Sequence, residues 1–563
     1  MSERAAQGRG STPWAIAAVL ILGLGAWLRW QTLSSIPSFL GPGDPAIYFG
    51  MARGVLREGA PVQDFLHHYL TRPHEIRHLE DYYEPAFGYL LAAAMALFGR
   101  TPQAAAGLSF VAGTLVMLFA GLLARRRGMA AVTAAMAVVA LEPWSIYYSG
   151  VLMKEAVIAC ATLAALWGTA RLVRGGGSTA RVGVLAAGIA FAAGLLQYES
   201  LPILLAASGA MLLLHRRPAL APFALASLLL VGALAAVTWR LLGVPISAKL
   251  LFIAGVNPGD PEGHAIAALH RSTLLPLGYI AQAVFTNWYP LLLILGLRGL
   301  ALAGAPAVER PWVLAYLVLH VWLHGIPIDL WSRDFIVLTA LLAAPAGEAL
   351  VSWRSWATRP GAGGLAWGAN AYVWLTPLAL SLLAAHVPGL ERVPAWARFA
   401  GMLPPAALVG WGARRLLAGG RATPVAAVTS LLFAASLVGQ YWLALPYPTI
   451  RLNPQFPDYE IERARRQRAS EWMRAQVPRG NVLAEHAEEV AYYSGFPAAD
   501  ITDDFRPDSF AALMRRYPFE YLLAPAVLVP DRLPAPFSLE LVGTHEGYRL
   551  YRVRVGSGPA RAP

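Results

Sequence analysis

Charged residues and cysteine are the scarce components of this 563-residue chain. Asp, Glu, Lys and Arg make up 14% of the residues, whereas hydrophobic types make up 57%, with a mean hydropathy of +0.49. A chain so long and so apolar is not a single soluble core, and this composition indicates a polytopic α-helical membrane protein. The only cysteine is Cys160, which excludes an intrachain disulfide.

Acidic residues are the rarer charge, and the imbalance is not even along the sequence. The first 446 residues hold 18 acidic and 30 basic residues, whereas the last 117 hold 15 of each. The net charge of +12 therefore belongs to the apolar part of the chain. A basic excess on loops between apolar runs is a signal of membrane topology, so no nucleic-acid partner is expected.

Long apolar runs dominate the first 446 residues. Thirteen of them approach the roughly 20 residues that a bilayer requires: 14–33, 103–124, 129–148, 153–173, 182–197, 199–214, 220–242, 274–297, 311–328, 333–352, 366–387, 396–413 and 423–446. The run 85–98 has only 14 residues. Its length is typical of a helix lying at the membrane interface.

The arginines between these runs test that interpretation, because loops rich in Lys and Arg stay on the cytoplasmic side. With 85–98 outside, the arginine-rich loops share one side, including Arg125–Arg127, Arg216–Arg217 and Arg414–Arg415. If 85–98 crossed, every later loop would invert. We therefore expect thirteen spans in the plasma (inner) membrane, with the N-terminus inside. The first run has no small-residue cleavage site and is expected to be retained.

Two parts follow from this topology: a membrane domain, 1–446, with a large outer loop at 34–102, and an extracytoplasmic domain, 447–563. In the second part, amphipathic "QRASEWMRAQVPRG" and "SFAALMRRY" predict helices. "NVLAEH", "EYLLAPA" and "LELVGTHEGYRLYRVRV" predict strands. We therefore expect a small α/β or α+β fold outside the membrane.

The charged residues nearest the membrane gather at the outer mouth of the bundle. Asp44 stands alone between two prolines in "GPGDPAIYFGMARGVLREG", and the outer face also receives Glu84, Lys154, Glu155, Lys249, Arg271 and Arg333. Charged groups at this depth are costly and usually functional. A transporter would place them near the midplane, so a non-enzymatic lipid-binding or transport protein is the weaker alternative.

These stretches resemble the GT-C class of membrane glycosyltransferases. They are most similar to the polyprenyl-phosphate-sugar-dependent group that contains protein mannosyltransferases and lipid A aminoarabinose transferases (glycosyltransferase families 39 and 83). The matching positions are Asp44, Tyr48, Ala52 and Gly59; Glu84 and Pro85; Pro143, Tyr147, Ser149 and Glu155; and Arg333. The chain departs from the pattern at Pro45, where the group commonly has an acidic residue. It also lacks the Lys and the second Pro that accompany the residues matching Glu84 and Pro85, and Gln197–Glu199 stands where an Arg is common.

The resemblance implies an enzyme that moves a sugar from a polyprenyl-phosphate donor to an acceptor hydroxyl or amine at the outer face. A lipid phosphate is already a good leaving group, so one carboxylate base and cations for the phosphate suffice. Asp44 is the expected base, and inversion would follow from direct attack. The expected donor and phosphate contacts are Tyr48, Glu84, Lys154, Glu155, Lys249, Arg271 and Arg333. The sequence identifies no certain cofactor, and a divalent metal is possible.

Each of these residues also has a structural interpretation. Asp44 before Pro45 is a good helix N-cap, and Glu84 could cap a helix that opens at Pro85. Lys154 and Glu155 could form a charge pair that snorkels at the membrane boundary. Arg333 could simply anchor a helix end.

One motif suggests a different class of enzyme. "HEIRH", His74–His78, matches the H-E-x-x-H pattern of zinc metalloproteases, in which two histidines on one helix face hold the metal and Glu is the base. The stretch follows Arg72–Pro73 in a polar loop, and no third ligand is evident. A membrane zinc metalloprotease, with His74 and His78 as metal ligands, is kept as an alternative.

Overall fold

The structure is a computed structural model. It describes residues 12–35, 44–66, 75–80, 83–242, 290–302, 308–325, 335–352, 455–500, 516–525 and 536–555, with the single residues Pro404, Arg415 and Met514. The expected spans at 366–387, 396–413 and 423–446 and the boundary at 446/447 lie outside these ranges, so the count of thirteen stays a prediction.

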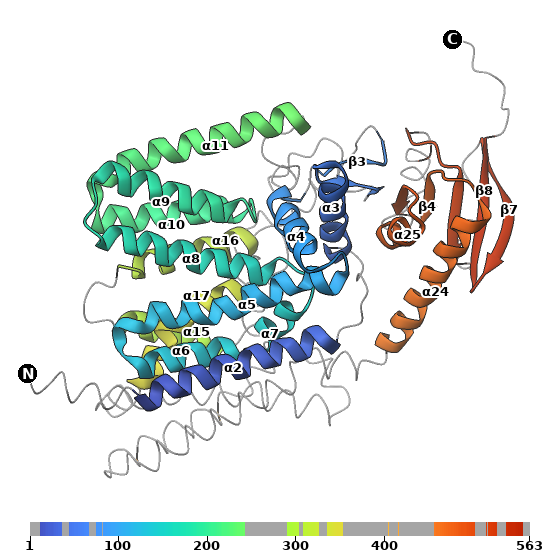
Figure 1. Ribbon diagram of the computed structural model, residues 1–563. Helices are drawn as coiled ribbons and strands as arrows, with labels where there is room; N and C mark the ends of the chain where they lie inside the picture. The colour runs from blue at the N-terminus through green and yellow to red at the C-terminus, as the bar shows by residue number, and fades with distance from the viewer. Residues whose placement is uncertain are drawn as a thin grey trace, which may run out of the picture.

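Apolar helices form at the expected runs in the described part of the membrane domain (Figure 1). Their bounds are α2 (Thr12–Ser35), α5 (Pro102–Ala124), α6 (Met129–Leu141), α8 (Glu155–Arg174), α9 (Thr179–Gly194), α10 (Ser200–His215), α11 (Leu220–Leu242), α15 (Pro290–Leu302), α16 (Arg310–Gly325) and α17 (Phe335–Val351). Among the described residues, four helices are long and apolar enough to cross a membrane, or five if the bent α6–α7 pair is one span.

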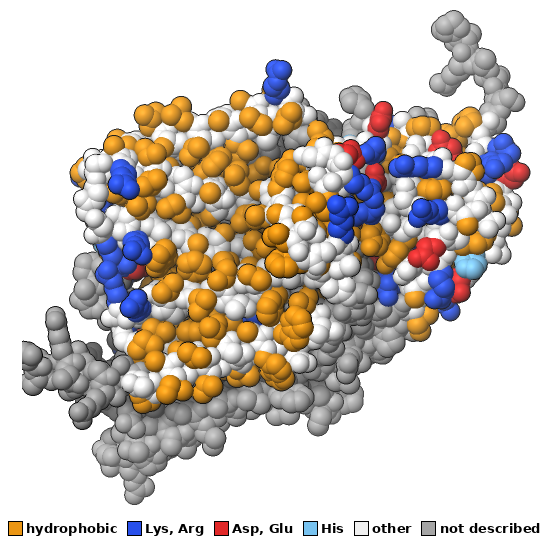
Figure 2. All heavy atoms as spheres, viewed as in Figure 1, with side chains coloured by type: hydrophobic (Ala, Val, Ile, Leu, Met, Phe, Trp, Pro, Cys, Tyr) orange, Lys and Arg blue, Asp and Glu red, His pale blue; other side chains and the backbone are white. Residues whose placement is uncertain are grey.

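The arginine-bearing turns meet at one end of this bundle. Arg127, in the turn after α5, pairs with Glu348 of α17, and Arg174 at the end of α8 pairs with Glu309. Arg216 donates to the Gly177 carbonyl at 2.9 Å. Figure 2 shows Lys and Arg side chains at this end and a largely hydrophobic surface between it and the charged C-terminal region. An apolar belt between two polar ends is the surface that a bilayer demands.

The run expected as one helix at 129–148 is broken, which corrects the sequence interpretation. It forms α6 and α7 (Pro143–Gly150), bent by 64° at Glu142. Pro143 has no N–H to donate to the Val139 carbonyl four residues earlier. Arg29 of α2, which is fully buried, donates to that carbonyl at 2.9 Å instead, and to the Ser145 hydroxyl at 2.9 Å. The buried arginine thus satisfies the helix end that proline frees.

The outer loop forms two further helices, α3 (Asp44–Glu58) and α4 (Pro85–Phe98). They pack on each other and run across the ends of the longer helices (Figure 1). Gly88 of α4 faces Met51 of α3 at a distance where an added Cβ would lie only 3.1 Å from the Met51 Cβ. The 14-residue α4 thus packs closely on α3, and its place at the membrane interface stays a prediction. Strands β1 (Val62–Gln63) and β3 (His78–Leu79) pair antiparallel, and β1 contacts α3.

The C-terminal region forms a six-stranded mixed sheet in the order β2-β5-β4-β6-β8-β7. Its strands are β4 (Val482–Ala484), β5 (Ala498–Asp500), β6 (Tyr521–Pro525), β7 (Phe537–His545) and β8 (Tyr548–Val555). Helix α24 (Gln455–Gln476) contacts β7 and β8, and helix α25 (Ala487–Ser494) contacts β2, β4 and β5. The strands lie where the sequence predicts them, except for β5.

The sixth strand comes from the outer loop and was not expected from the sequence. It is β2 (Phe65–Leu66), which pairs parallel to β5 at the edge of the sheet. The Ala498 N–H also donates to the Asp64 carbonyl at 3.0 Å. The loop that follows the Asp44 helix is therefore built into the C-terminal sheet.

Candidate functional site

Asp44 opens α3 at the end of the bundle that faces the C-terminal region. The chain begins the helix here because Asp favours a helix start and Pro45, with its fixed φ, is suited to the first turn. The Asp44 side chain is half-buried, and its Oδ1 accepts a hydrogen bond of 2.7 Å from the Tyr83 hydroxyl. A negative charge at a helix start is stabilised by the helix dipole. The carboxylate is therefore held in one orientation while part of it stays accessible.

Tyr48 lies one helical turn after Asp44 and is the central ring of an aromatic cluster with Tyr83 and Phe87. It is 1% exposed, and its ring meets the rings of Tyr83 and Phe87 edge-on, at centroid distances of 5.5 and 4.9 Å. Aromatic rings prefer this arrangement because the edge of one ring faces the electron-rich face of the other. The Tyr48 hydroxyl has no hydrogen-bond partner among the described residues.

Lys154 and Glu84 form a buried ion pair beside this cluster. Lys154 Nζ lies 2.7 Å from Glu84 Oε2, and their side chains are 4% and 1% exposed. The ammonium also lies 5.7 and 5.8 Å from the ring centroids of Tyr48 and Tyr83. The electron-rich face of an aromatic ring attracts a nearby cation, and this attraction stabilises a buried ammonium. This pair joins the outer loop to the turn between α7 and α8.

Further hydrogen bonds hold Glu84 and the backbone beside Lys154 in place. Glu84 Oε1 accepts a hydrogen bond of 3.2 Å from the Tyr198 N–H, in the turn between α9 and α10. The Ser109 hydroxyl donates to the Met153 carbonyl at 2.7 Å, next to Lys154. Glu84 therefore does not act as a side-chain cap of α4, which makes no such bond. Because Lys154 is buried, it does not snorkel to the interface either.

The electrostatics of the cluster follow from its burial. Burial, and then the charge of Asp44, raise the pKa of Tyr48 well above its usual value. Burial, and then Glu84, raise the pKa of Tyr198 to about 12. Both phenols are thus neutral at physiological pH. Glu155, the first residue of α8, is 8% exposed and adds another carboxylate nearby, which also raises the pKa of Tyr48.

The structure brings five residues predicted from the sequence into one site: Asp44, Tyr48, Glu84, Lys154 and Glu155. Lys249, Arg271 and Arg333 lie outside the described residues, so their roles stay predictions. Two participants were missed. Tyr83 precedes Glu84 directly, and Tyr198 stands where the resemblance leads one to expect an arginine nearby; both are tyrosines beside acidic residues in an apolar chain, which is the signal that could have identified them.

The metalloprotease alternative does not agree with the geometry. Glu75, Ile76 and Arg77 form bends, and His78 lies in strand β3, so this part of "HEIRH" is not helical. Arg77 pairs with Glu58 and with Asp64. His74 lies outside the described residues. Residues 75–78 therefore do not form the helix that the zinc motif requires.

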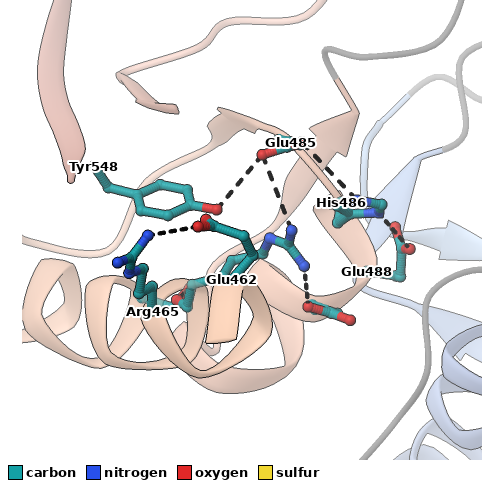
Figure 3. A network of polar contacts seen from close by, with 9 residues as sticks. Glu462, Arg465, Glu485, His486, Glu488 and Tyr548 are labelled. Carbon is teal, nitrogen blue, oxygen red and sulfur yellow. Dashed lines mark hydrogen bonds and ion pairs between the residues drawn. The ribbon is translucent and has the colours of Figure 1, made fainter. Parts of the chain in front are cut away.

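A different group has side chains that could meet a metal. In the part of the chain that the structure describes, ligand atoms of His486, Glu488 and Asp500 lie within 4.8 Å of one another. Burial lowers the pKa of His486, but its hydrogen bond to Glu488 and the other nearby carboxylates outweigh this and raise it. Figure 3 shows His486 directed at Glu488 within the polar network of the C-terminal region.

Comparisons with known proteins show similarity at the level of structure. No protein-family profile and no curated protein matches the sequence. The crystal structure of ArnT from Cupriavidus metallidurans in the apo state matches with a TM-score of 0.52 at 16% identity, covering 96% of this chain and 98% of that one. The same protein bound to undecaprenyl phosphate gives 0.49 at 14% identity, covering 96% and 99%. The apo oligosaccharyltransferase from Archaeoglobus fulgidus gives 0.48 at 13% identity, covering 91% and 69%.

The apo ArnT match spans nearly the whole of both chains. ArnT is a lipid A aminoarabinose transferase of the GT-C class. The resemblance inferred from the sequence motifs is therefore confirmed for the architecture, and the chain has the fold of the GT-C membrane glycosyltransferases.

Proposed function

We propose that this chain transfers a sugar from a polyprenyl-phosphate-linked donor to an acceptor hydroxyl or amine at the extracytoplasmic face of the plasma membrane. The observation that carries the proposal is the grouping at one mouth of a GT-C fold. Tyr83 orients Asp44 there by a hydrogen bond, and the Tyr83 ring also lies near the ammonium of the buried Lys154–Glu84 pair. The Tyr48 hydroxyl of the same cluster has no hydrogen-bond partner among the described residues. Tyr48 and Tyr83 connect the two groups, because the Lys154 ammonium lies 5.7 and 5.8 Å from their ring centroids.

The proposed reaction is a direct displacement with Asp44 as the general base. The acceptor proton passes to the Asp44 carboxylate while the acceptor oxygen or nitrogen forms a bond to the anomeric carbon. The bond between that carbon and the phosphate oxygen breaks, and its electron pair leaves with the polyprenyl phosphate. A single displacement inverts the configuration at the anomeric carbon. A positioned base contributes typically 100- to 10,000-fold to such a step.

The charge of the cluster bears on how the phosphate is held. Among the described residues of the site, Asp44, Glu84 and Glu155 bring three carboxylates against one ammonium, that of Lys154. A donor phosphate would meet net repulsion unless further cations approach. Lys249, Arg271 and Arg333, on the outer loops, are the proposed source of that charge. The Tyr48 hydroxyl is a further proposed donor, because a buried polar atom left without a partner costs about 1–3 kcal/mol.

The proposal is tested by mass spectrometry of lipids that co-purify with the protein. We expect a polyprenyl phosphate or its glycoside to be enriched over a preparation of an unrelated polytopic protein from the same membranes. Transfer is then assayed with that glycoside. Absence of any polyprenyl lipid, together with no turnover of polyprenyl-phosphate sugars, would contradict the donor class.

The proposed orientation is tested by labelling single cysteines with a membrane-impermeant thiol reagent in intact cells. In a Cys160→Ser background, cysteines at the exposed positions Arg126 and Arg181 should be protected, because they lie at the arginine end. Cysteines at Gln476 and Arg479, exposed in the C-terminal region, should react. Labelling at position 126 from outside would invert the topology and remove the site from the outer face.

A further inference from the structure

The helix that carries Asp44 contacts the C-terminal region on a face adjacent to the site. Asp44 and Tyr48 are one turn apart on α3, and Phe49 and Arg53 form the neighbouring stripe, also one turn apart. This second stripe meets Tyr492 of α25. The Phe49 and Tyr492 rings are edge-on at 5.5 Å, and the Arg53 guanidinium lies 5.0 Å from the Tyr492 ring centroid.

The loop after α3 holds the same helix from another direction. Gln63 is 1% exposed, and its Nε2 donates to the Ile47 carbonyl at 2.9 Å. Gly54 permits this close approach, because an added Cβ would lie 2.4 Å from the Val62 carbonyl oxygen. The next residues, Phe65 and Leu66, pair with β5 of the C-terminal sheet. Helix α3 is thus connected to the C-terminal region by side-chain packing and by strand pairing.

Helix α25 is in turn fixed within the C-terminal region by buried charges. Arg466 of α24 donates to Glu489 of α25 at 2.5 Å, with side chains 3% and 0% exposed. The same guanidinium lies 4.0 Å from Glu485, to which the Tyr548 hydroxyl donates at 3.5 Å. Figure 3 shows this network joining α24 to the start of α25 and to β8. A buried, paired arginine tolerates little displacement of its partners.

We infer that Tyr492 is a positioning residue, through which the C-terminal region sets the place of Asp44 at the mouth of the bundle. Tyr492 touches neither Asp44 nor the Lys154–Glu84 pair in the contacts above; it acts through Phe49 and Arg53 on the helix between them. The inference rests on the proposed function of Asp44. Its physical reason is that a general base must stay within hydrogen-bond reach of the acceptor, and small displacements of such a group are expensive in rate.

The test compares Tyr492→Ala with Tyr492→Phe in the full-length protein. Alanine removes the ring that both α3 residues contact, and we expect kcat to fall by about 10-fold or more, since a misplacement of 1 Å can cost about 100-fold. KM for the lipid-linked donor should change by less than about threefold, because the donor contacts are intact. Phenylalanine keeps the ring and should retain activity to within about twofold.

Tyr551→Ala is the matched control, because Tyr551 lies on β8 and packs, partly buried, against a core of the same C-terminal region. If Tyr492→Ala acts only by loosening the C-terminal region, the two alanine variants will show equal losses of kcat at equal melting temperatures, and the inference is overturned. A double-mutant cycle with Phe49→Leu adds a second check: coupled rather than additive effects on kcat are expected for residues in contact.

Hydrogen exchange of the α3 amides gives a result that does not depend on activity. Tyr492→Ala should accelerate exchange over Ile47–Arg53, and Tyr551→Ala should not. Unchanged exchange in both would contradict the inference. If Asp44→Asn abolishes transfer while Tyr492→Ala is fully active, the inference fails and the proposed function stands. If Asp44→Asn is fully active but Tyr492→Ala loosens α3, the role of Asp44 fails while the coupling stands.

Discussion

Replacing Asp44 with asparagine should reduce sugar transfer by about 100-fold or more, the usual contribution of a general base. Asparagine starts a helix nearly as well as aspartate and keeps the shape of the side chain. The hydrogen bond that Tyr83 donates at 2.7 Å can pass to the amide oxygen. What the substitution removes is the ability to take a proton. The melting temperature in detergent should therefore stay within a few degrees of the parent protein, while kcat falls.

Tyr83→Phe is the companion variant, because it keeps the aromatic contact with Tyr48 and deletes only the hydroxyl. Losing a hydrogen bond to a charged group costs about 1.5–3 kcal/mol, so a loss of about 10-fold or more in rate is expected. Asp44 itself remains, so the loss should be smaller than that of Asp44→Asn. Near-normal turnover in Asp44→Asn would reduce Asp44 to a helix-start residue and would remove the proposed base.

The helices of the membrane part could be predicted because one physical requirement dominates them. A backbone in lipid must satisfy its own hydrogen bonds, so a long apolar run becomes a helix almost regardless of its neighbours. The exception is instructive. The run at 129–148 has the right length, but Pro143 breaks it, and the break is tolerated because Arg29, more than a hundred residues earlier, supplies the missing donor. Only the folded structure could reveal that pairing.

Strand β2 could not be predicted from the sequence, because it too depends on a distant part of the chain. Two residues, Phe65 and Leu66, carry no periodicity that a strand prediction could use. They become a strand because β5 offers a parallel edge, and that edge is formed from the other end of the chain. The outer loop and the C-terminal region looked separable in the sequence, since the basic excess and the apolar runs end near residue 446. Their shared sheet depends on contacts at long sequence separation.

The candidate site was predicted in part because charged residues are rare here. Asp44, Glu84 and Lys154 were conspicuous in an apolar chain, and topology placed them at the same mouth. Their pairing could not be predicted: Glu84 and Lys154 are 70 residues apart and each had a local explanation. Tyr83 and Tyr198 were overlooked because an aromatic residue at a membrane interface needs no special reason.

Breaking the Glu84–Lys154 pair should have the largest effect on stability in the described site. The pair is buried, with Nζ and Oε2 2.7 Å apart, and removing one partner of such a pair costs about 3–5 kcal/mol because the other charge stays buried. Lys154→Met should therefore lower the melting temperature clearly. Glu84→Gln is milder in shape, since its amide oxygen can still accept from the Tyr198 N–H, but it leaves the ammonium without its counter-ion.

The double variant Glu84→Gln/Lys154→Met separates a structural pair from a functional one. It contains neither charge, and replacing a buried ion pair by neutral groups of similar volume is often neutral for stability or gains about 1–4 kcal/mol. The melting temperature should therefore return towards that of the parent protein. If the Lys154 ammonium acts on the donor phosphate, transfer should stay at least about 10-fold down in the double variant, because losing a bond to a charged group costs about 1.5–3 kcal/mol. Recovery of transfer together with stability would mean that the pair only joins the outer loop to the turn before α8. Thermal melts and donor-dependent kinetics on the same four proteins distinguish the two results, because a stability defect is repaired in the double variant and a missing cation is not.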